Sequence, residues 1–152
     1  MEILAGLHPR LVHFPIAFFV LYFLLETAGV MLKKEFLTKA AYIVLGLGIL
    51  SALAAVLTGN QAHEVAKNLI ANNPGAKQLV ESHETFATYS LWYFAALFFY
   101  RTYLVVKKKF SEKFQFLFIL LSLLGCVLIL LAGYYGGDLV INYGIGTKLL
   151  GK

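Results

Sequence analysis

Apolar residues dominate four segments of the chain, and polar residues gather between them. A transmembrane helix needs about 20 largely apolar residues to cross a bilayer, and each segment is long enough. The segments are Leu11–Leu32, Ala40–Leu57, Phe86–Val106 and Phe116–Tyr135. The pattern therefore predicts an all-α fold, an integral membrane antiparallel four-helix bundle that forms one domain over residues 1–152. We find no internal repeat in the pattern.

The links between these segments differ in length. The first and the third are short and basic, which favours antiparallel hairpins. The middle link holds two stretches, Gln61–Ala71 and Ala76–Thr85, on either side of the sequence Asn72-Asn73-Pro74-Gly75. We expect both stretches to be helical extensions at the outer face of the bilayer, joined by a Pro-Gly turn.

The composition agrees with a membrane location. Of the 152 residues, 60% are hydrophobic and only 14% are charged, too few charges for the surface of a protein in water. No small-residue cleavage site follows the first apolar segment, so we expect that segment to remain as a span and not to be a signal peptide. The net charge of +5 includes no basic stripe with interleaved aromatic residues outside the spans, which argues against nucleic-acid binding.

The basic residues are divided unequally between the two ends of the predicted bundle. One end has eight, namely Lys33, Lys34, Lys39, Arg101, Lys107, Lys108, Lys109 and Lys113. The other has five, namely Arg10, Lys67, Lys77, Lys148 and Lys152. Because cytoplasmic loops carry the excess of Lys and Arg, we predict a multi-pass protein of the inner (plasma) membrane with both termini outside the cytoplasm.

All four histidines fall at the predicted outer end, namely His8, His13, His63 and His83. Pro9 fits the first position of a helix, where a missing N–H is no loss. Pro15 disfavours regular helix just before it, so we expect a distorted turn that aims His13 inward. Carboxylates at the same end can orient a ligating imidazole through its other nitrogen. They are Glu64, Glu84 and Asp138, the last in a Gly136-Gly137-Asp138 turn.

Three interpretations of the histidines stay open. In the preferred one, two histidines on different helices bind a b-type haem as axial ligands, with His13 and His83 as the first choice. His8 and His63 are then a second pair or supporting groups, and Arg10 neutralises a haem propionate. In the second, three of the four histidines and a carboxylate bind zinc, copper or iron. In the third, the histidines bind no cofactor and the chain is a structural or assembly subunit.

Glu26 lies inside the first span, where an ionisable side chain generally faces the bundle interior, so it can pair with Arg101. We favour a structural role for this acid. Small residues form one seam on each of two spans, namely Gly48, Ala52, Ala55 and Gly59, and Ser122, Gly125, Gly133 and Gly136. Such seams allow close helix packing or leave room for a flat cofactor. The single cysteine, Cys126, excludes a disulfide within the chain.

Two sequence strings resemble the signatures of a bacterial family of four-helix membrane proteins long filed as a domain of unknown function. The first is Leu7-His8-Pro9-Arg10-Leu11-Val12-His13-Phe14-Pro15-Ile16-Ala17. The second is Gly136-Gly137-Asp138-Leu139-Val140-Ile141-Asn142-Tyr143-Gly144-Ile145-Gly146. Thr58-Gly59 and Ser82-His83-Glu84 are similar to it as well. The resemblance implies the four-span fold and maps His8, His13 and His83 onto histidine positions of the family.

Some relatives in that family are fused to Rieske or c-type cytochrome modules, which implies redox work. The resemblance thus favours an electron carrier over a stand-alone enzyme, with a quinone, a periplasmic redox protein or another subunit as partner, and an oligomer is possible. No phosphate-binding loop, nucleophile elbow or HExxH motif is present in the sequence, so hydrolase and nucleotide-driven functions have no support.

Overall fold

The structure is a computed structural model that describes residues 2–146. These residues form five α-helices and no strand. The helices are α1 (Glu2–Leu11), α2 (His13–Met31), α3 (Glu35–Ala71), α4 (Pro74–Val106) and α5 (Glu112–Tyr143). The predicted all-α bundle is confirmed.

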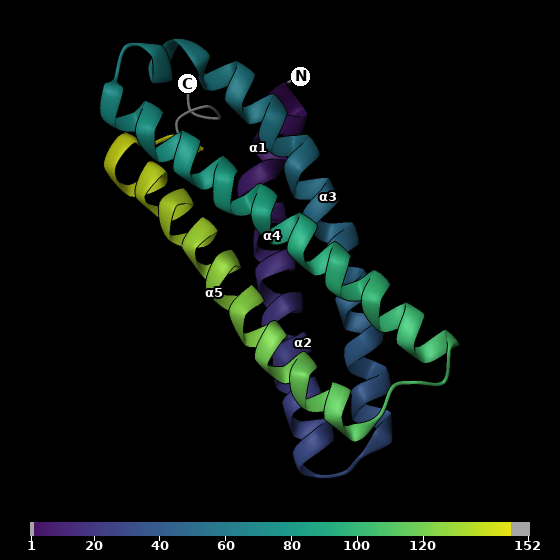
Figure 1. Cartoon of the computed structure of the whole chain (residues 1–152). Coiled ribbons are helices and arrows are strands. Elements are labelled where there is room, and N and C mark those ends of the chain that lie inside the picture. The colour runs from purple at the N-terminus through teal and green to yellow at the C-terminus, as the bar shows by residue number, and fades with distance from the viewer. Residues whose placement is uncertain (1, 147–152) are drawn as a thin grey trace.

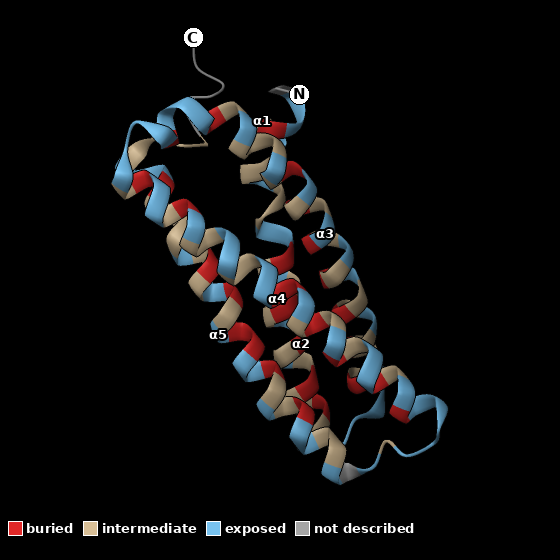
Figure 2. Cartoon of the chain, turned by 45° about the horizontal axis from the view of Figure 1, so that its top comes forward, coloured by how far each residue is buried: buried red, intermediate tan, exposed pale blue. Residues whose placement is uncertain are grey.

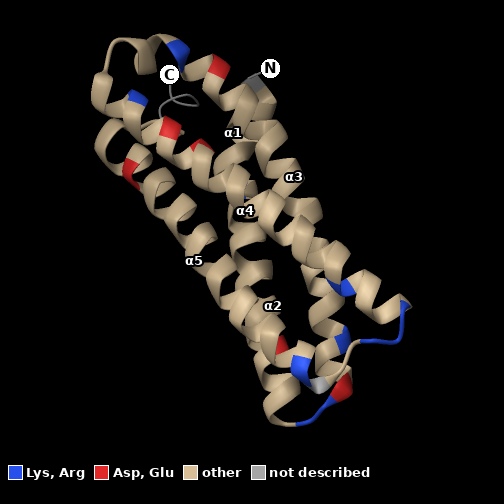
Figure 3. Ribbon diagram, in the orientation of Figure 1, with Lys and Arg blue, Asp and Glu red and all other residues tan. Residues whose placement is uncertain are grey.

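The helices form two antiparallel hairpins that lie side by side (Figure 1). In the first, α1 and α2 run almost in line and pack along α3; in the second, α4 packs along α5. The hairpins join through contacts of α2 with α5 and of α3 with α4. We call the end with the loops 32–34 and 107–111 the lysine end, since basic residues concentrate there (Figure 3). The opposite end, with α1 and the α3–α4 link, is the histidine end.

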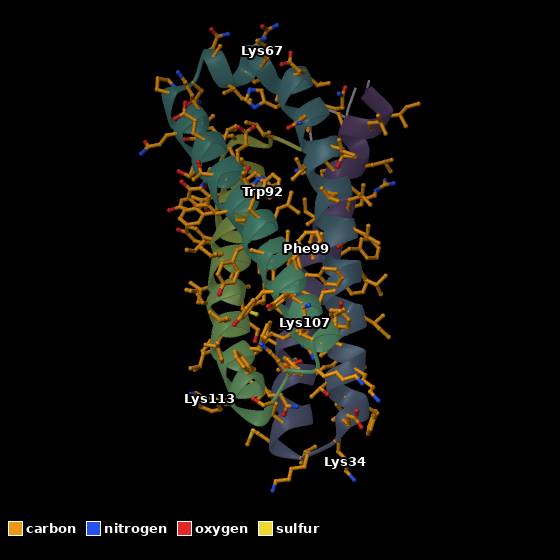
Figure 4. The ribbon with its side chains drawn as sticks, turned by 45° about the vertical axis from the view of Figure 1, so that its right-hand side comes forward. Lys34, Lys67, Trp92, Phe99, Lys107 and Lys113 are labelled. Atoms are coloured by element: carbon orange, nitrogen blue, oxygen red, sulfur yellow. The ribbon has the colours of Figure 1, made fainter. Side chains whose placement is uncertain are left out.

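Three segments are long and apolar enough to cross a membrane, namely Ile3–Met31, Glu35–Ala71 and Lys113–Tyr143. They correspond to three of the four predicted spans. The span predicted at Phe86–Val106 lies in α4, which is less apolar because it carries Arg101 and several tyrosines. Buried residues line the interior of the bundle and exposed ones its outside (Figure 2). Trp92 and Phe99 are large exposed side chains of α4, between the ends marked by Lys67 and Lys34 (Figure 4).

The predicted extensions are present. Helix α3 has 37 residues, which at 1.5 Å per residue amount to about 55 Å, well beyond the roughly 30 Å of hydrocarbon in a bilayer. Helix α4 starts at Pro74, and the side chain of Asn73 caps it by accepting a hydrogen bond from the Ala76 amide at 3.3 Å. The two predicted helical stretches are confirmed, but the turn between them lies at Asn72-Asn73, and Pro74 and Gly75 already belong to α4.

Three local predictions near the histidine end differ from the structure in part or in full. The helix is interrupted at Val12 between α1 and α2, next to the distortion predicted from Pro15, but His13, which we expected to point inward, is exposed. Pro9, however, lies inside α1 and not at its first position. The expected turn at Gly136-Gly137-Asp138 is continuous helix within α5. Glycine is tolerated inside membrane helices, because it allows neighbouring groups to approach closely.

Two stacked phenylalanines occupy the centre of the bundle. The rings of Phe19 on α2 and Phe94 on α4 are parallel within 7°, with centroids 3.7 Å apart, and both side chains are fully buried. Each ring packs against a glycine of its own hairpin: Gly48 lies beside Phe19 and Gly125 beside Phe94. A Cβ atom at either glycine would overlap the ring, so these members of the small-residue seams serve close packing.

Nearer the lysine end, Arg101 of α4 meets Glu26 of α2. Nη1 of Arg101 donates to Oε2 of Glu26 at 2.5 Å, and Nη2 donates to the carbonyl oxygen of Thr38 at 2.8 Å. Both charged side chains are buried, and the Phe110 ring covers the guanidinium with its centroid 4.8 Å away. The predicted pairing of Glu26 with Arg101 is confirmed. Because of it, the charge of Arg101 is not isolated inside the bundle.

The two hairpins repeat one set of contacts, which the sequence pattern did not indicate. Arg101 follows Glu26 by 75 residues, and the same interval separates Phe94 from Phe19 and His83 from His8. Both hairpin loops also contain a lysine with positive φ at this interval, Lys33 (52°) and Lys108 (53°). Because the glutamate–arginine, phenylalanine and histidine pairs each meet between the hairpins, we infer that the hairpins are related by an approximate two-fold axis that runs along the bundle.

Replacing Gly48 by alanine should destabilise the bundle, because the added methyl group would collide with the stacked Phe19 ring. We expect a loss of about 1–3 kcal/mol in the free energy of unfolding, as for other overpacked sites. Gly46→Ala is the matched control on the same helix, since its Cβ would make an ordinary contact of 3.5 Å with Phe98. Unfolding midpoints of the detergent-solubilised variants measure the effect, and equal midpoints for the two would contradict this account of the core.

Candidate functional site

A cavity of about 620 Å³ lies at the histidine end of the bundle. Side chains from all five helices line it, including the four histidines, which are His8, His13, His63 and His83. Sequence reasoning placed these residues at one end of the bundle, and the structure brings them to the wall of one cavity. Their individual environments differ.

His8, on α1, is held against α3. Its Nδ1 lies 3.0 Å from the carbonyl oxygen of Ala55 and 3.3 Å from the Thr58 hydroxyl oxygen. A carbonyl oxygen only accepts hydrogen bonds, so Nδ1 of His8 carries the proton and Nε2 keeps its lone pair. The ring also lies over Gly59, where a Cβ atom would come within 3.0 Å of its Cε1.

His83, on α4, is held against α5 in the same manner. Its Nδ1 lies 2.9 Å from the carbonyl oxygen of Ala132, which again leaves Nε2 with the lone pair. The ring lies over Gly136, where a Cβ atom would come within 3.0 Å of Nδ1. In both hairpins, the accepting carbonyl belongs to the alanine one helical turn before the glycine. His8 and His83 are therefore equivalent under the repeat.

The two equivalent imidazoles meet near the two-fold axis. Their ring centroids are 6.2 Å apart, and the ring planes are inclined by 78°. Because each ring is fixed by a hydrogen bond to a main-chain carbonyl, its orientation does not depend on a mobile side chain. The structure thus holds one half-buried imidazole on each hairpin, with its Nδ1 hydrogen-bonded to the main chain and its Nε2 not used in that bond.

His63 on α3 forms a different contact. Its Nδ1 lies 2.6 Å from Oε1 of Glu84 on α4, and both side chains are partly exposed. The expected carboxylate partner is therefore present, although Glu84 holds His63 and not its own neighbour His83. Glu64 instead pairs with Lys67 at 3.5 Å, and Asp138 is not among the residues that line the cavity.

The remaining candidates are less constrained. His13 begins α2 and lines the cavity, but it is exposed and has no hydrogen-bond partner among residues 2–146. Arg10 is exposed on α1 and does not line the cavity. The histidine in ring contact with His83 is thus His8, whereas sequence reasoning preferred His13. The equal spacing of His8–His83 and Glu26–Arg101 was the signal in the sequence that could have identified it.

The rest of the cavity wall is mostly apolar and small. It includes Ala52, Ala55, Gly133 and Gly136 from the two seams, with Leu91 of α4 beside them. The seams therefore serve close packing, as the sequence allowed: their central glycines pack against phenylalanines, and Gly59 and Gly136 at the histidine end pack against the imidazoles. Within the described part of the chain, no group of three or more His, Cys, Asp or Glu side chains gathers closely enough to hold a metal ion.

A family model described as predicted membrane protein (DUF2231) matches residues 5–149. No curated protein and no solved structure matches the chain.

We predict that His8 and His83 are fixed as the Nδ1–H tautomer in the ligand-free protein, because a carbonyl oxygen accepts from each Nδ1. His13, which lacks such a partner in the described structure, should exchange between tautomers. Solid-state ¹⁵N NMR of histidine-labelled protein in lipid distinguishes these states. Assignment uses one His→Gln variant at a time, and an Nε2–H tautomer at His8 or His83 would contradict the geometry.

Proposed function

The chain belongs to the DUF2231 family of predicted membrane proteins, and from that starting point we propose that it is a b-type haem protein that transfers electrons in the lipid bilayer. The observation that carries this proposal is the pair His8 and His83, whose rings lie next to each other between the two hairpins with centroids 6.2 Å apart. This pair replaces His13 and His83 as the proposed axial ligands.

The separation of the rings supports axial ligation of one metal. A metal–nitrogen bond of about 2.0 Å and about 1.2 Å from that nitrogen to the ring centroid put two imidazoles on opposite sides of one metal about 6.4 Å apart. The observed 6.2 Å agrees within a few tenths of an ångström. The angle of 78° between the planes is compatible, because each imidazole can rotate about its bond to the metal.

The hydrogen bonds of the pair support the same role. A ligating histidine usually donates its other ring N–H to a carbonyl or a carboxylate, which fixes the ring and increases its basicity as a ligand. His8 and His83 both do so, to Ala55 and Ala132. Each bond ends on a backbone carbonyl of a packed helix, so the two ligands are preorganised.

The cavity around the pair fits a flat, largely apolar group. Its volume is about 620 Å³, and the glycines and alanines that line it on α3 and α5 have no large side chains to fill it. When bound there, haem supplies an iron that exchanges one electron at a time. The protein's own contribution is to supply the two imidazoles and to surround them with apolar side chains, and such burial is one of the factors that set the potential of a haem.

The other polar residues then have supporting roles. His63 with Glu84, and His13, lie on the wall of the same cavity and can contact polar edges of the group. Arg10 remains the proposed partner of a propionate. A zinc site of the usual kind needs three or four protein ligands, so a pair of opposed imidazoles favours haem over the non-haem metal site considered from the sequence.

The proposal includes a place and partners for the protein. With the lysine end in the cytoplasm, the histidine end and both termini face the periplasm or the outside of the plasma membrane. The haem then lies where it can exchange electrons with a periplasmic or extracellular redox protein, and a quinone in the bilayer is a second possible partner. We propose an electron carrier and not a stand-alone enzyme.

Removing either axial ligand should abolish haem binding. After haem-replete expression, we expect the unchanged protein to show a Soret band and reduced α-band, and His8→Ala and His83→Ala to lose both. His13→Ala is the matched control, since it lines the same cavity without the ring contact, and it should retain the spectrum. A colourless, iron-free parent protein would end the haem proposal. If His13→Ala lost the haem spectrum and His8→Ala kept it, the ligands would be His13 and His83, as first expected from the sequence.

The orientation can be tested separately. In a Cys126→Ala background, we expect a cysteine in place of Lys77 to react with a membrane-impermeant maleimide in intact cells. A cysteine in place of Lys34 should react only after the membrane is permeabilised. Both lysines are exposed, and they lie at opposite ends of the bundle, Lys34 in the loop between α2 and α3 and Lys77 in the first turn of α4. The reverse pattern of labelling would place the histidine end in the cytoplasm.

A further inference from the structure

Four buried side-chain polar atoms of the described residues have no hydrogen-bond partner; one is Oγ1 of Thr27, a partly buried residue of α2, and the other three lie on buried side chains in the half of the bundle nearer the lysine end. These three are Tyr22 Oη and Glu26 Oε1 on α2, and Arg101 Nε on α4. Tyr22 and Glu26 are 0% exposed and Arg101 is 2% exposed. Each belongs to a residue that nothing in the proposed haem site uses.

The three residues form one cluster. Arg101 contacts Glu26 through Nη1, which leaves Oε1 of the carboxylate and Nε of the guanidinium unused. Tyr22 lies one helical turn from Glu26, and it is close enough to interact electrostatically with both Glu26 and Arg101. The unpartnered atoms therefore belong to one group of side chains around the ion pair.

Such a cluster needs an explanation, because a buried polar atom without a partner costs about 1–3 kcal/mol. The hydrocarbon outside the bundle provides no hydrogen-bond partner for these atoms. Tyr22 Oη can donate or accept, Arg101 Nε donates and Glu26 Oε1 accepts. A water molecule, which both donates and accepts, can satisfy all three, and the two to four polar partners that a buried water requires are present. A purely cationic or anionic ligand would satisfy only part of the set.

We propose that Tyr22, Glu26 and Arg101 form an internal proton-binding site, in which water joins their three free polar atoms and Glu26 takes up and releases a proton through that water. The proton arriving from bulk solvent bonds to Oε1, and the carboxylate becomes a neutral carboxylic acid. Release reverses this step. Arg101 keeps its charge throughout, because a guanidinium does not lose its proton in proteins.

The surroundings leave Glu26 as the group that changes charge. From α4 it faces Arg101, and from its own helix Tyr22. From α3, the Thr38 carbonyl accepts from Arg101, and the Tyr42 ring lies 5.4 Å from the guanidinium carbon. From α5, the centroid of the Phe118 ring lies 5.7 Å from the guanidinium carbon. The ordinary pKa of a carboxyl lies well below those of a phenol and a guanidinium, so Glu26 is the group among these that a fall in pH protonates.

The water is tested first in the unchanged protein. Radiolytic hydroxyl-radical labelling modifies side chains beside bound water even where bulk solvent does not reach. We expect oxidation of Tyr22, together with no oxidation of Phe19, which is equally buried on the same helix but stacks on an apolar ring. Equal absence of labelling at Tyr22 and Phe19 would overturn the proposal.

The proton is tested by infrared difference spectroscopy of the lipid-reconstituted protein between two pH values. We expect a carboxylic acid band that Glu26→Gln removes and that Glu35→Gln, at an exposed carboxylate paired with Lys39, leaves unchanged. Tyr22→Phe removes one partner of the water but no charge, so it should shift the band without removing it. A band that is absent from the parent, or that Tyr22→Phe does not move, would contradict the proposed site.

Both experiments are independent of haem. They can be repeated in the His8→Ala/His83→Ala double variant, whose substitutions lie at the other end of the bundle. Retention of the band in that variant would support the proton site. The same result in a parent protein that binds no haem would support the proton site although the haem proposal fails. If Glu26→Gln does not fold, Tyr22→Phe and the labelling of the parent protein still decide the outcome.

Discussion

The structure depends on one constraint of the bilayer: polar groups inside it must find partners within the protein. Arg101 meets this constraint only because α2 brings Glu26 to it across the bundle, and the same approach stacks Phe19 on Phe94. The two rings fit into the centre of the bundle because Gly48 and Gly125 leave space for them. The ion pair, the aromatic stack and the imidazole pair are thus three contacts that join the two hairpins.

Much of this fold could be predicted from the sequence. The apolar segments, the excess of lysine at one end and the position of the histidines depend on composition and spacing, which the sequence gives directly, and the pairing of Glu26 with Arg101 follows from the exclusion of lone charges from hydrocarbon. The course of the chain at Pro9 and at Gly136-Gly137-Asp138 was predicted wrongly. There, packing against neighbouring helices keeps residues helical that in water would break a helix.

The histidine pair could not be chosen from the sequence, because all four histidines lie at the same end. The choice depends on which main-chain carbonyl lies opposite each imidazole, and that is determined by the packing of α1 on α3 and of α4 on α5. The hydrophobic pattern did not indicate the repeat either. Identical residues 75 positions apart, such as His8 and His83 or Phe19 and Phe94, are scattered among positions that differ, and a pattern of hydrophobicity does not record which residue occupies an apolar position.

The opposite charges of Glu26 and Arg101 bear on the ancestry of the chain. An assembly of two identical hairpins would bring together two histidines and two phenylalanines, both of which make acceptable pairs, but it would also oppose two glutamates or two arginines. Joining the halves in one polypeptide allows each to mutate by itself, so that one acquires the acid and the other the base. The ion pair is the point at which this molecule cannot be a symmetric dimer of identical hairpins.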